Sequence, residues 1–286
     1  MKVSSDTKLY AIIGDPIEHS LSPVMQNVAF QHLDLDSVYL AFRVRPQDLE
    51  AAIAGMRSLG VLGFNITIPH KVSVMKYLDK VDYQAIEVGA VNTVVNKNGV
   101  FVGYNTDGAG ALAALREENV ELKGRRTVLL GAGGAARALA FSIAPLTESL
   151  VILNRTESKA KDLASAIKRF NAAAEGKKLS EATLRSKLAD ADVLINSTPV
   201  GMYPRVGECL VNGSLMHSRM VVFDVVYNPP ETRLLREAKK AGAKAVGGLN
   251  MLVHQGVLSF KIWTGIEPPV DIMFRAAEEA LEGKSD

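Results

Sequence analysis

The chain has 286 residues, of which 48% are hydrophobic and 22% are charged, and its formal net charge is +2. These values are typical of a globular protein with two domains or one large one, and they give no support to a nucleic-acid or membrane partner. No apolar run reaches the ~18 residues of a membrane helix, no signal-like apolar segment begins the chain, and the single cysteine, Cys209, excludes an internal disulfide, so we expect a cytoplasmic protein.

The first part of the chain predicts an alternation of strands and helices. Ser22 followed by Pro23 predicts a helix with serine at the N-cap and proline at the first helical position. Asn98-Gly99 predicts the turn of a hairpin. We expect strands at residues 8–14, 38–44, 63–71, 90–96 and 100–104, and helices at 22–33, 46–59, 71–78 and 109–118.

A glycine-rich segment follows a short apolar run in the middle of the chain. Val128 to Leu130 predicts a strand buried on both faces of a parallel sheet, and the chain then reads Gly131, Gly133, Ala136 in the pattern G-x-G-x-x-G/A. Strand, glycine turn and helix in this order form a site for the phosphates of a dinucleotide. The expected binding loop consists of Gly131, Ala132, Gly133, Gly134 and Ala135.

The next apolar run indicates which dinucleotide is bound. Leu150 to Leu153 predicts the second parallel strand, and it ends in Asn154-Arg155-Thr156. An NAD site usually carries a carboxylate here, ~20 residues after the glycines, to bind the ribose 2′-hydroxyl. Neither Asn154 nor Arg155 supplies one, and the guanidinium of Arg155 suits a phosphate instead. The sequence therefore predicts NADP.

The remainder of the chain predicts the rest of the dinucleotide domain and a return to the first one. Residues 198–202 form a strand-end loop expected to face the cofactor, and 175–178 a polar loop. Further strands are expected at residues 193–197, 221–226 and 245–246, and helices at 157–171, 184–188, 232–241, 250–264 and 270–281. The fold class is therefore α/β with a substrate-binding domain at 1–106 and 250–286, a Rossmann-like domain at 107–249, and an active-site cleft expected between them.

Polar side chains recur at the strand ends and loops of the first domain. Each has a simpler explanation of its own, such as a helix cap, an exposed strand edge or a surface lysine. Together they suit a small polyhydroxylated substrate with one carboxylate, and no histidine spacing predicts a metal site. The residues are Ser20, Ser22, Asn65, Thr67, Lys71, Asn92 and Asp107.

Lys71 and Asp107 are the ionisable pair in this set, and we expect them to be the catalytic pair. His70 is a weaker candidate for an acid, because the neighbour of Lys71 on the same turn points elsewhere. Which member of the pair carries the proton is left open by the sequence.

The chain resembles shikimate dehydrogenases along nearly its whole length. The resemblance is carried by eight ordered segments, which are Ser20 to Pro23, Asn65 to Lys71, Gly89 to Thr93, Asn105 to Gly108, Gly131 to Arg137, Asn154 to Thr156, Ser197 to Met202 and Gly248 to Gln255. Such enzymes reduce 3-dehydroshikimate to shikimate with NADPH during aromatic amino-acid synthesis, so the resemblance implies this activity here.

The resemblance also implies roles for individual residues. Shikimate or 3-dehydroshikimate would be held by Ser20, Ser22, Thr67, Asn92, Asp107, Tyr227 and Gln255. The NADP site would be lined by the glycine loop and by Asn154, Arg155, Thr156, Lys159, Thr198, Val225, Gly248 and Met251.

Two other functions remain open at this stage. A quinate/shikimate dehydrogenase that uses NAD is disfavoured because no acidic residue stands at Asn154 or Arg155. A non-catalytic module that senses shikimate or NADP would have no need of both Lys71 and Asp107. The sequence leaves open whether the protein is a monomer or a homodimer.

Overall fold

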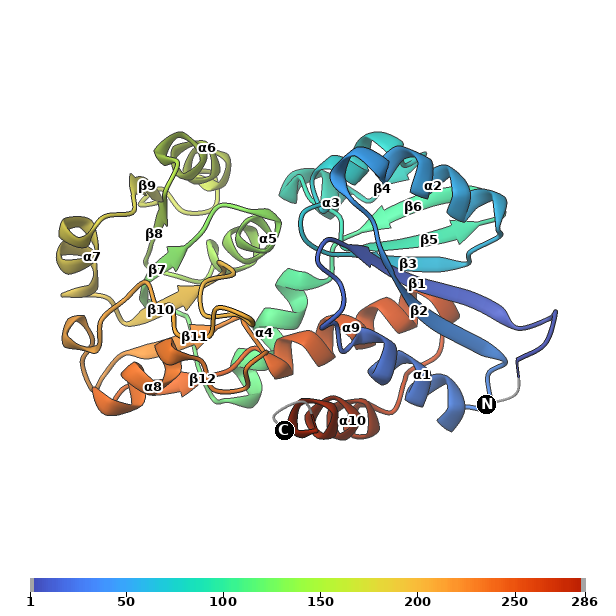
Figure 1. Cartoon of the computed structure of the whole chain (residues 1–286). Coiled ribbons are helices and arrows are strands. Elements are labelled where there is room, and N and C mark those ends of the chain that lie inside the picture. The colour runs from blue at the N-terminus through green and yellow to red at the C-terminus, as the bar shows by residue number, and fades with distance from the viewer. Residues whose placement is uncertain (1–2, 284–286) are drawn as a thin grey trace. The chain divides into compact units, whose positions relative to one another are not determined.

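The computed structural model describes residues 3–283 and divides into two compact units (Figure 1). The first contains the described residues up to Gly110 and from Val253 onward, and the second contains Ala111–Leu252. The two crossings between units fall inside helices α4 (Asp107–Glu117) and α9 (Leu249–Thr264). The assignment of substrate to one unit and NADP to the other stays a prediction.

The first unit contains a six-stranded mixed sheet in the order β2-β1-β3-β5-β6-β4. β1, β2 and β3 are parallel, β5 runs antiparallel to both β3 and β6, and β4 is parallel to β6. The predicted hairpin is confirmed, with Asn98 and Gly99 at φ values of 54° and 88°. The strands are β1 (Lys8–Gly14), β2 (Ser37–Arg43), β3 (Gly63–Ile66), β4 (Lys80–Val81), β5 (Thr93–Lys97) and β6 (Val100–Tyr104).

Helices cover both faces of this sheet. On one face, α2 (Leu49–Ser58) packs its apolar side chains into a core with Phe64 and Phe101. On the other, Tyr10 of β1 contacts Phe30 of α1 and Trp263 of α9 at ring-centroid distances of 5.1 and 5.4 Å. Helix α10 packs against α1. The remaining elements are α1 (Ser22–His32), α3 (Tyr83–Val88), α10 (Val270–Glu282) and the 3₁₀ turns η1 (Pro46–Asp48) and η2 (Ser73–Tyr77).

The second unit contains a six-stranded sheet, all parallel, in the order β12-β11-β10-β7-β8-β9. Numbered from its own first strand, this order is that of a doubly wound dinucleotide-binding fold, with its switch point between β7 and β10. The prediction of an α/β protein with a Rossmann-like parallel sheet is confirmed. The strands are β7 (Arg126–Leu130), β8 (Ser149–Asn154), β9 (Glu175–Lys178), β10 (Val193–Asn196), β11 (Val221–Asp224) and β12 (Lys244–Val246).

Two hydrophobic cores lie on the opposite faces of this second sheet. One is built with α4, α5 (Gly134–Ile143) and α6 (Glu157–Ile167), and the other with α7 (Glu181–Leu188) and α8 (Arg233–Lys240), beside the 3₁₀ turn η3 (Gly213–Leu215). Burial on both faces explains why β7, β8, β10 and β11 read as continuous apolar runs rather than alternating ones.

The polar segment 175–178 is a strand and not the loop that its sequence predicts. It forms β9 at the edge of the sheet, where Glu175 to Lys178 pair with Val151 to Asn154 of β8. A Cβ atom at Gly176 would lie 2.3 Å from the carbonyl carbon of Ala160 in α6, so glycine permits this close approach. An exposed edge strand needs no apolar run, and pairing with β8 overrides the weak local preference.

Several predicted boundaries are also wrong in the first unit. Ser22 is the first residue of α1 rather than its N-cap, which is Leu21 and makes no side-chain cap. The strand expected at 63–71 ends at Ile66, and Lys71 starts no helix, because only the short turn η2 forms beyond it. Helix α3 was not expected from the sequence. Over residues 3–283, every helix is too short or too polar to cross a bilayer.

Candidate active site

The ends of four segments meet at one edge of the first sheet. β1 and β3 are parallel and in register at Ile13 and Ile66, so the loops that follow them leave the sheet together. Because β5 is antiparallel to β3 and β6, the beginning of β5 and the end of β6 lie at this same edge. This topology brings the loops carrying Ser20, Thr67, Asn92 and Asp107 to one side of the sheet.

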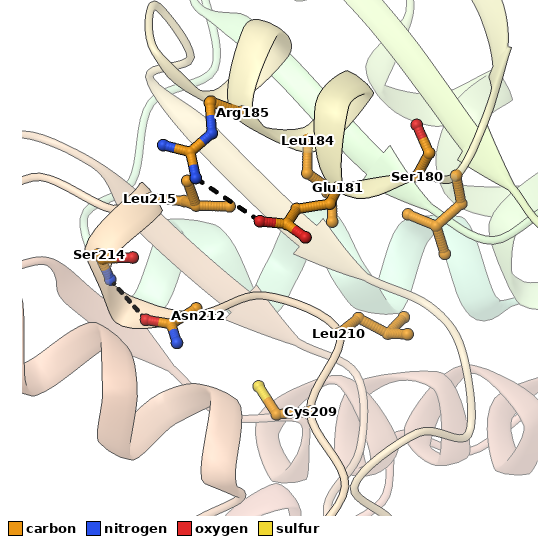
Figure 2. Close-up of a pocket in the computed structure, with 10 residues that line it drawn as sticks. Ser180, Glu181, Leu184, Arg185, Cys209, Leu210, Asn212, Ser214 and Leu215 are labelled. Carbon is orange, nitrogen blue, oxygen red and sulfur yellow. Dashed lines mark hydrogen bonds and ion pairs between the residues drawn. The ribbon is translucent and has the colours of Figure 1, made fainter.

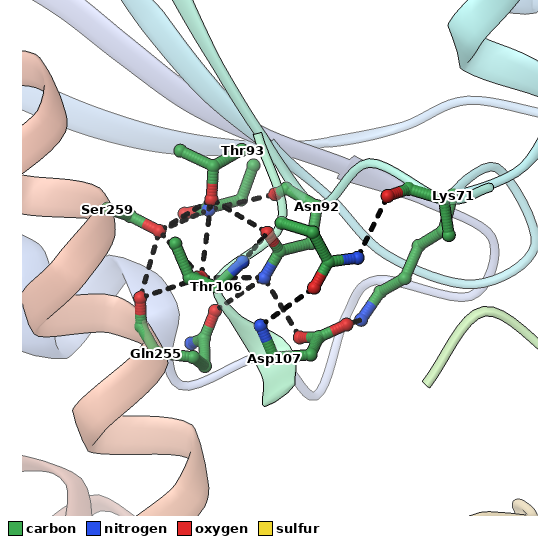
Figure 3. Close-up of polar contacts among 10 residues, drawn as sticks. Lys71, Asn92, Thr93, Thr106, Asp107, Gln255 and Ser259 are labelled. Carbon is green, nitrogen blue, oxygen red and sulfur yellow. Dashed lines mark hydrogen bonds and ion pairs between the residues drawn. The ribbon is translucent and has the colours of Figure 1, made fainter. Parts of the chain in front are cut away.

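Lys71 and Asp107 form an ion pair at this edge (Figure 3). The Lys71 Nζ atom lies 2.5 Å from Oδ2 of Asp107, and the two side chains are 15% and 4% exposed. Asp107 is the first residue of α4, and its other carboxylate oxygen, Oδ1, accepts a hydrogen bond of 2.9 Å from Asn92 Nδ2. The carboxylate is therefore held at both oxygens, while the lysine retains access to solvent.

Asn92 fixes the orientation of this pair. Its Oδ1 accepts from the backbone N–H of Thr106 at 2.8 Å, which defines the amide orientation. Its Nδ2 then faces Thr106 Oγ1 at 2.8 Å, Asp107 Oδ1 at 2.9 Å and Gln255 Oε1 at 3.2 Å. Asn92 is 2% exposed, so these bonds form away from water and hold one geometry.

A second layer of buried polar side chains supports Asn92. Asn65 donates from Nδ2 to Asn92 O at 3.0 Å and to Ser259 Oγ at 3.0 Å, and its Oδ1 accepts from the Tyr39 hydroxyl at 2.6 Å. Thr93 Oγ1 lies 2.8 Å from Ser259 Oγ and completes the network (Figure 3). Burial raises the pKa of Tyr39 well above its usual range, although a hydrogen bond with Ser22 opposes the shift.

This second layer changes how the Asn65 prediction is interpreted. Both polar groups of Asn65 already have partners, and its side chain is 4% exposed. Direct binding of substrate by Asn65 stays a prediction. Sequence reasoning missed Tyr39, Thr93 and Ser259. The four-residue spacing of Gln255 and Ser259, which places both on one face of α9, is the signal that could have found Ser259.

Ser20 and Thr67 lie in the loops at the same edge, and Ser22 begins α1 directly after the first of these loops. The backbone N–H of Ser22 donates to Ser20 Oγ at 3.3 Å, so the two residues are adjacent. Ser20 is half-buried and Ser22 buried. Thr67 is half-buried and packs on Gly14, where a Cβ atom would lie 2.4 Å from Thr67 Cγ2. By contrast, His70 is 1% exposed and its Nε2 bonds to Val44 O at 2.6 Å, so its ring has a structural partner.

The glycine loop of the second unit has the properties of a phosphate site. Gly131 has φ of +109°, and a Cβ atom there would lie 2.8 Å from Ser197 Oγ, so the tight turn requires glycine. Gly133 is exposed, and apart from its own neighbours along the chain no protein atom lies within 4 Å of where its Cβ would be. Gly133 is also the N-cap of α5, and because glycine has no side chain it leaves the first N–H groups of the helix uncapped. Open space before free helical N–H groups fits the pyrophosphate of a dinucleotide.

The end of β8 provides the second part of the predicted cofactor site. Asn154 ends the strand, and its Nδ2 donates to Thr156 O at 2.9 Å, which shapes the turn into α6. Arg155, Thr156 and Lys159 are exposed around this turn. Glu157, the first residue of α6, is paired with Lys161 at 2.8 Å. This turn between β8 and α6, called the corner below, therefore exposes the cationic side chains of Arg155 and Lys159. Exposed cations fit a phosphate better than a ribose hydroxyl.

A buried carboxylate holds the loops after β10 and β11. Asp224 is fully buried and accepts hydrogen bonds from Thr232 Oγ1 at 2.7 Å, Asn196 Nδ2 at 2.9 Å and the Val226 N–H at 3.1 Å. Burial raises its pKa to about 6, although these three bonds oppose the shift. Asn196 Oδ1 in turn accepts from the Thr198 hydroxyl at 2.7 Å, so one network fixes both loops.

The other predicted cofactor and substrate residues of the second unit follow these loops. Val225 and Tyr227 are partly exposed directly after β11. Gly248 lies against the Val225 carbonyl, where a Cβ atom would come within 2.4 Å of the oxygen. Met251 is buried and belongs to the core beneath α4 and α5. The structure thus places Thr198, Val225, Tyr227 and Gly248 on neighbouring backbone, all within the second unit.

A hollow of about 490 Å³ lies elsewhere in the second unit, between α7 and the segment around η3 (Figure 2). Its lining includes Leu184, Cys209 and Leu215, and none of the predicted site residues contributes to it. Among residues 3–283, no three His, Cys, Asp or Glu side chains are grouped in a way that could hold a metal ion.

Comparison with known families and proteins shows what this geometry is similar to. Residues 12–94 match the shikimate dehydrogenase substrate binding domain, 112–232 match shikimate / quinate 5-dehydrogenase, and 248–278 match the shikimate 5′-dehydrogenase C-terminal domain. The NADP(+) shikimate dehydrogenase of Methanocaldococcus jannaschii is 46% identical over 96% of this chain and 97% of its own length.

Solved structures agree with these matches. A crystal structure of a shikimate dehydrogenase in complex with NADP+ has a TM-score of 0.91 and 44% identity, covering 98% of both chains. The shikimate 5-dehydrogenase of Thermus thermophilus in complex with NADP(H) and shikimate has a TM-score of 0.86 and 36% identity, covering 96% of this chain and 100% of the other. In both cases the similarity extends over the two units.

Proposed function

Because this chain belongs to the shikimate dehydrogenase family, we propose that it is an NADP-dependent oxidoreductase that interconverts 3-dehydroshikimate and shikimate. The reaction is a step toward chorismate and the aromatic amino acids. The observation that carries the proposal is the Lys71–Asp107 ion pair, held by Asn92 at the strand edge where the other polar loops of the first unit meet.

The first unit supplies the groups that suit a small hydroxylated acid. The hydroxyls of Ser20 and Ser22 stand two residues apart and hold the substrate carboxylate. Thr67 and Asn92 bind the ring hydroxyls from the same edge, with Gln255, whose Oε1 already contacts Asn92 at 3.2 Å. Tyr227 of the second unit completes the predicted set.

Lys71 and Asp107 carry out the proton chemistry. NADPH, when bound, would supply the hydride that reduces the carbonyl carbon of 3-dehydroshikimate. Lys71 hydrogen-bonds the carbonyl oxygen and donates a proton from Nζ as the C=O π electrons become an O–H bond. In the oxidation of shikimate the same amine accepts that proton. Asp107 orients the ammonium through Oδ2 and is itself fixed by Asn92 at Oδ1.

Substitution of each partner tests this division of roles. A general acid–base group contributes typically ~10²–10⁴-fold, so Lys71→Ala should lower kcat by about that factor with only a modest change in KM. Because loss of Lys71 leaves a buried carboxylate without its cation, urea unfolding of the variant is the necessary control. Asp107→Asn keeps an oxygen for the Asn92 bond and should be milder. Near-normal kcat in Lys71→Ala with abolished turnover in Asp107→Asn would make the aspartate the principal catalyst.

The cofactor preference follows from the corner at the end of β8. We propose that Arg155 binds the 2′-phosphate of NADP with Thr156 and Lys159 beside it, supported by the exposure of all three and by the absence of a carboxylate at Asn154 and Arg155. A hydrogen bond to a charged group contributes about 1.5–3 kcal/mol, so Arg155→Ala should weaken NADP roughly 10- to 100-fold and leave NAD little changed. Equal losses for both cofactors would refute this role.

One assay tests the function as a whole. Purified protein is supplied with shikimate or quinate and with NADP+ or NAD+, and formation of the reduced cofactor is followed by absorbance. We expect turnover of shikimate with NADP+, and slower turnover in the other three combinations. Turnover of quinate with NAD+ as the best pair would favour the alternative quinate/shikimate dehydrogenase. Binding of shikimate without any turnover would favour a sensing module. Because all predicted site residues belong to one chain, the proposed function holds for a monomer and for a homodimer alike.

A further inference from the structure

The edge strand β9 places a lysine beside the corner where the 2′-phosphate is expected. In the parallel pairing of β8 and β9, Lys178 is in register with Asn154, and the backbone N–H of Leu179 donates to Asn154 O at 3.0 Å. Neighbouring strands lie about 4.8 Å apart. The backbone of Lys178 is therefore one strand spacing from Asn154, and Arg155 is the next residue along the chain.

Strand alternation separates Lys178 from its neighbour Lys177. Gly176 packs on Ala160 of α6, so Gly176 and Lys178 share the face of the sheet that α6 covers. Glu175 and Lys177 share the opposite face, where Glu175 also pairs with Lys187 of α7 at 3.0 Å.

The surroundings of the two lysines differ in charge. The Lys177 ammonium lies 3.4 Å from Glu175, so a carboxylate partly neutralises it. For Lys178, no ion pair of the ammonium occurs within the described residues 3–283. The pKa of Glu157, at the start of α6, is lowered first by a hydrogen bond from Lys161, with smaller contributions from the charges of Lys178 and then Lys177. The Lys178 charge is thus felt at the first residue of α6.

We propose that Lys178 is a further cationic partner of the cofactor's 2′-phosphate, acting beside Arg155 and Lys159 to set the preference for NADP over NAD. The inference rests on the proposed function, because it requires NADP to occupy the corner after β8. A lysine side chain spans roughly 6 Å, which exceeds one strand spacing, so its ammonium reaches an anion held at Arg155.

The charge of the ligand and the exposure of the corner leave a role for a further cation. The 2′-phosphate carries up to two negative charges at neutral pH, and the carboxylate of Glu157 at the start of α6 is already paired with Lys161. Arg155 is exposed, so water weakens its attraction for the phosphate. Lys178 adds a mobile point charge on the side of the corner that β9 forms, whereas Arg155 adds a planar donor.

The test compares Lys178→Gln with Lys177→Gln, which removes the same charge from the opposite face of the same strand. Binding of NADP+ and NAD+ to each variant is measured by isothermal titration calorimetry in the absence of shikimate, at low and high salt. Thermal unfolding of each variant checks that the edge strand is intact. Lys178→Gln should weaken NADP+ about fivefold, as expected for a partly screened ion pair worth ~1 kcal/mol, and should leave NAD+ unchanged. Lys178→Arg should retain NADP+ binding.

The outcomes separate this inference from the proposed function. If the unmodified protein fails to prefer NADP+, the cofactor assignment itself is wrong. If the unmodified protein prefers NADP+ and Lys178→Gln keeps the full preference, only the role of Lys178 is overturned. Equal losses in Lys178→Gln and Lys177→Gln would also overturn it, because they would indicate a general effect of net charge. A smaller salt dependence of the NADP+/NAD+ affinity ratio in Lys178→Gln would support direct contact with the phosphate.

Discussion

Replacing Gly133 by alanine should weaken binding of the cofactor without lowering the stability of the fold. The φ and ψ angles of Gly133 are −85° and −169°, which alanine readily adopts, and apart from neighbours along the chain no protein atom lies within 4 Å of the added Cβ. A compatible Gly→Ala change stabilises a protein by ~0.4–1 kcal/mol, so the free energy of unfolding should stay equal or rise slightly. The methyl group would instead occupy the space through which the pyrophosphate reaches the N–H groups of α5.

Gly131→Ala is the matched comparison, because there the protein itself resists a side chain. A φ of +109° costs an alanine about 1–3 kcal/mol, and a Cβ atom 2.8 Å from Ser197 Oγ adds an overpacking cost of about 1–3 kcal/mol. Gly131→Ala should therefore lose roughly 2–6 kcal/mol of unfolding free energy. Loss of one backbone hydrogen bond to a phosphate costs about 1.5–3 kcal/mol, so Gly133→Ala should bind NADP+ ~10- to 100-fold more weakly.

Urea unfolding and calorimetric titration with NADP+ measure the two effects separately. Titration with shikimate alone is the control, since its predicted residues in the first unit are far along the chain from the glycine loop. The reasoning fails if Gly133→Ala binds NADP+ with unchanged affinity, because the pyrophosphate would then not pass over this residue. A large loss of stability in Gly133→Ala would equally contradict it, since the structure provides open space there.

Two further predictions concern the substrate carboxylate and the buried Asp224. Replacing Ser20 and Ser22 together by alanine should raise the KM for shikimate ~100-fold and change kcat little, because the carboxylate is unchanged in the reaction. Steady-state assays with saturating NADP+ measure both constants, and a fall in kcat alone would place the serines at the reacting carbon. Asp224 has its folded-state pKa raised from 3.8 to about 6, so the unfolded chain releases this proton first as pH rises. The stability of the unmodified protein relative to Asp224→Asn should therefore fall by about 2.4 kcal/mol between pH 4 and pH 7, as measured by urea unfolding, and a rise in relative stability over this range would contradict the prediction.

Much of the fold was predictable because its signals are local. The runs 128–130 and 150–153 are apolar, since both faces of their sheet are covered, and the glycines after the first run mark the tight turn into α5. The polar residues Asn92 and Asp107 lie within short motifs at strand ends. Local patterns of this kind are enough to predict a two-part α/β enzyme, whereas the residues proposed for its site stay a prediction.

The parts that escaped prediction depend on contacts between distant segments. Strand β9 consists of Glu175-Gly176-Lys177-Lys178, and only its pairing with β8 makes it a strand. Ser259 is a single serine in α9, and its role as a partner of Asn65 and Thr93 becomes visible only when α9 is placed against the sheet. Tyr39 likewise reads as an ordinary strand aromatic until its hydroxyl is seen to bond Asn65. Periodicity records burial, but it does not record which buried polar groups will meet.

The path of the chain through the two units also dictates an order of assembly during synthesis. The sheet of the first unit is complete by Tyr104, but Gln255 and Ser259, which hydrogen-bond beneath Asn92 and Asn65, come only after the whole second unit. The aromatic contacts of Phe30 with Phe260 also wait for that segment. Because domains tend to fold as units as they emerge, the second unit can be completed while the first unit still exposes a polar and aromatic face. The unit that is begun first is therefore finished last, and a chain that ends at residue 252 would contain every residue of the second unit but not the segment from Val253 onward that completes the first.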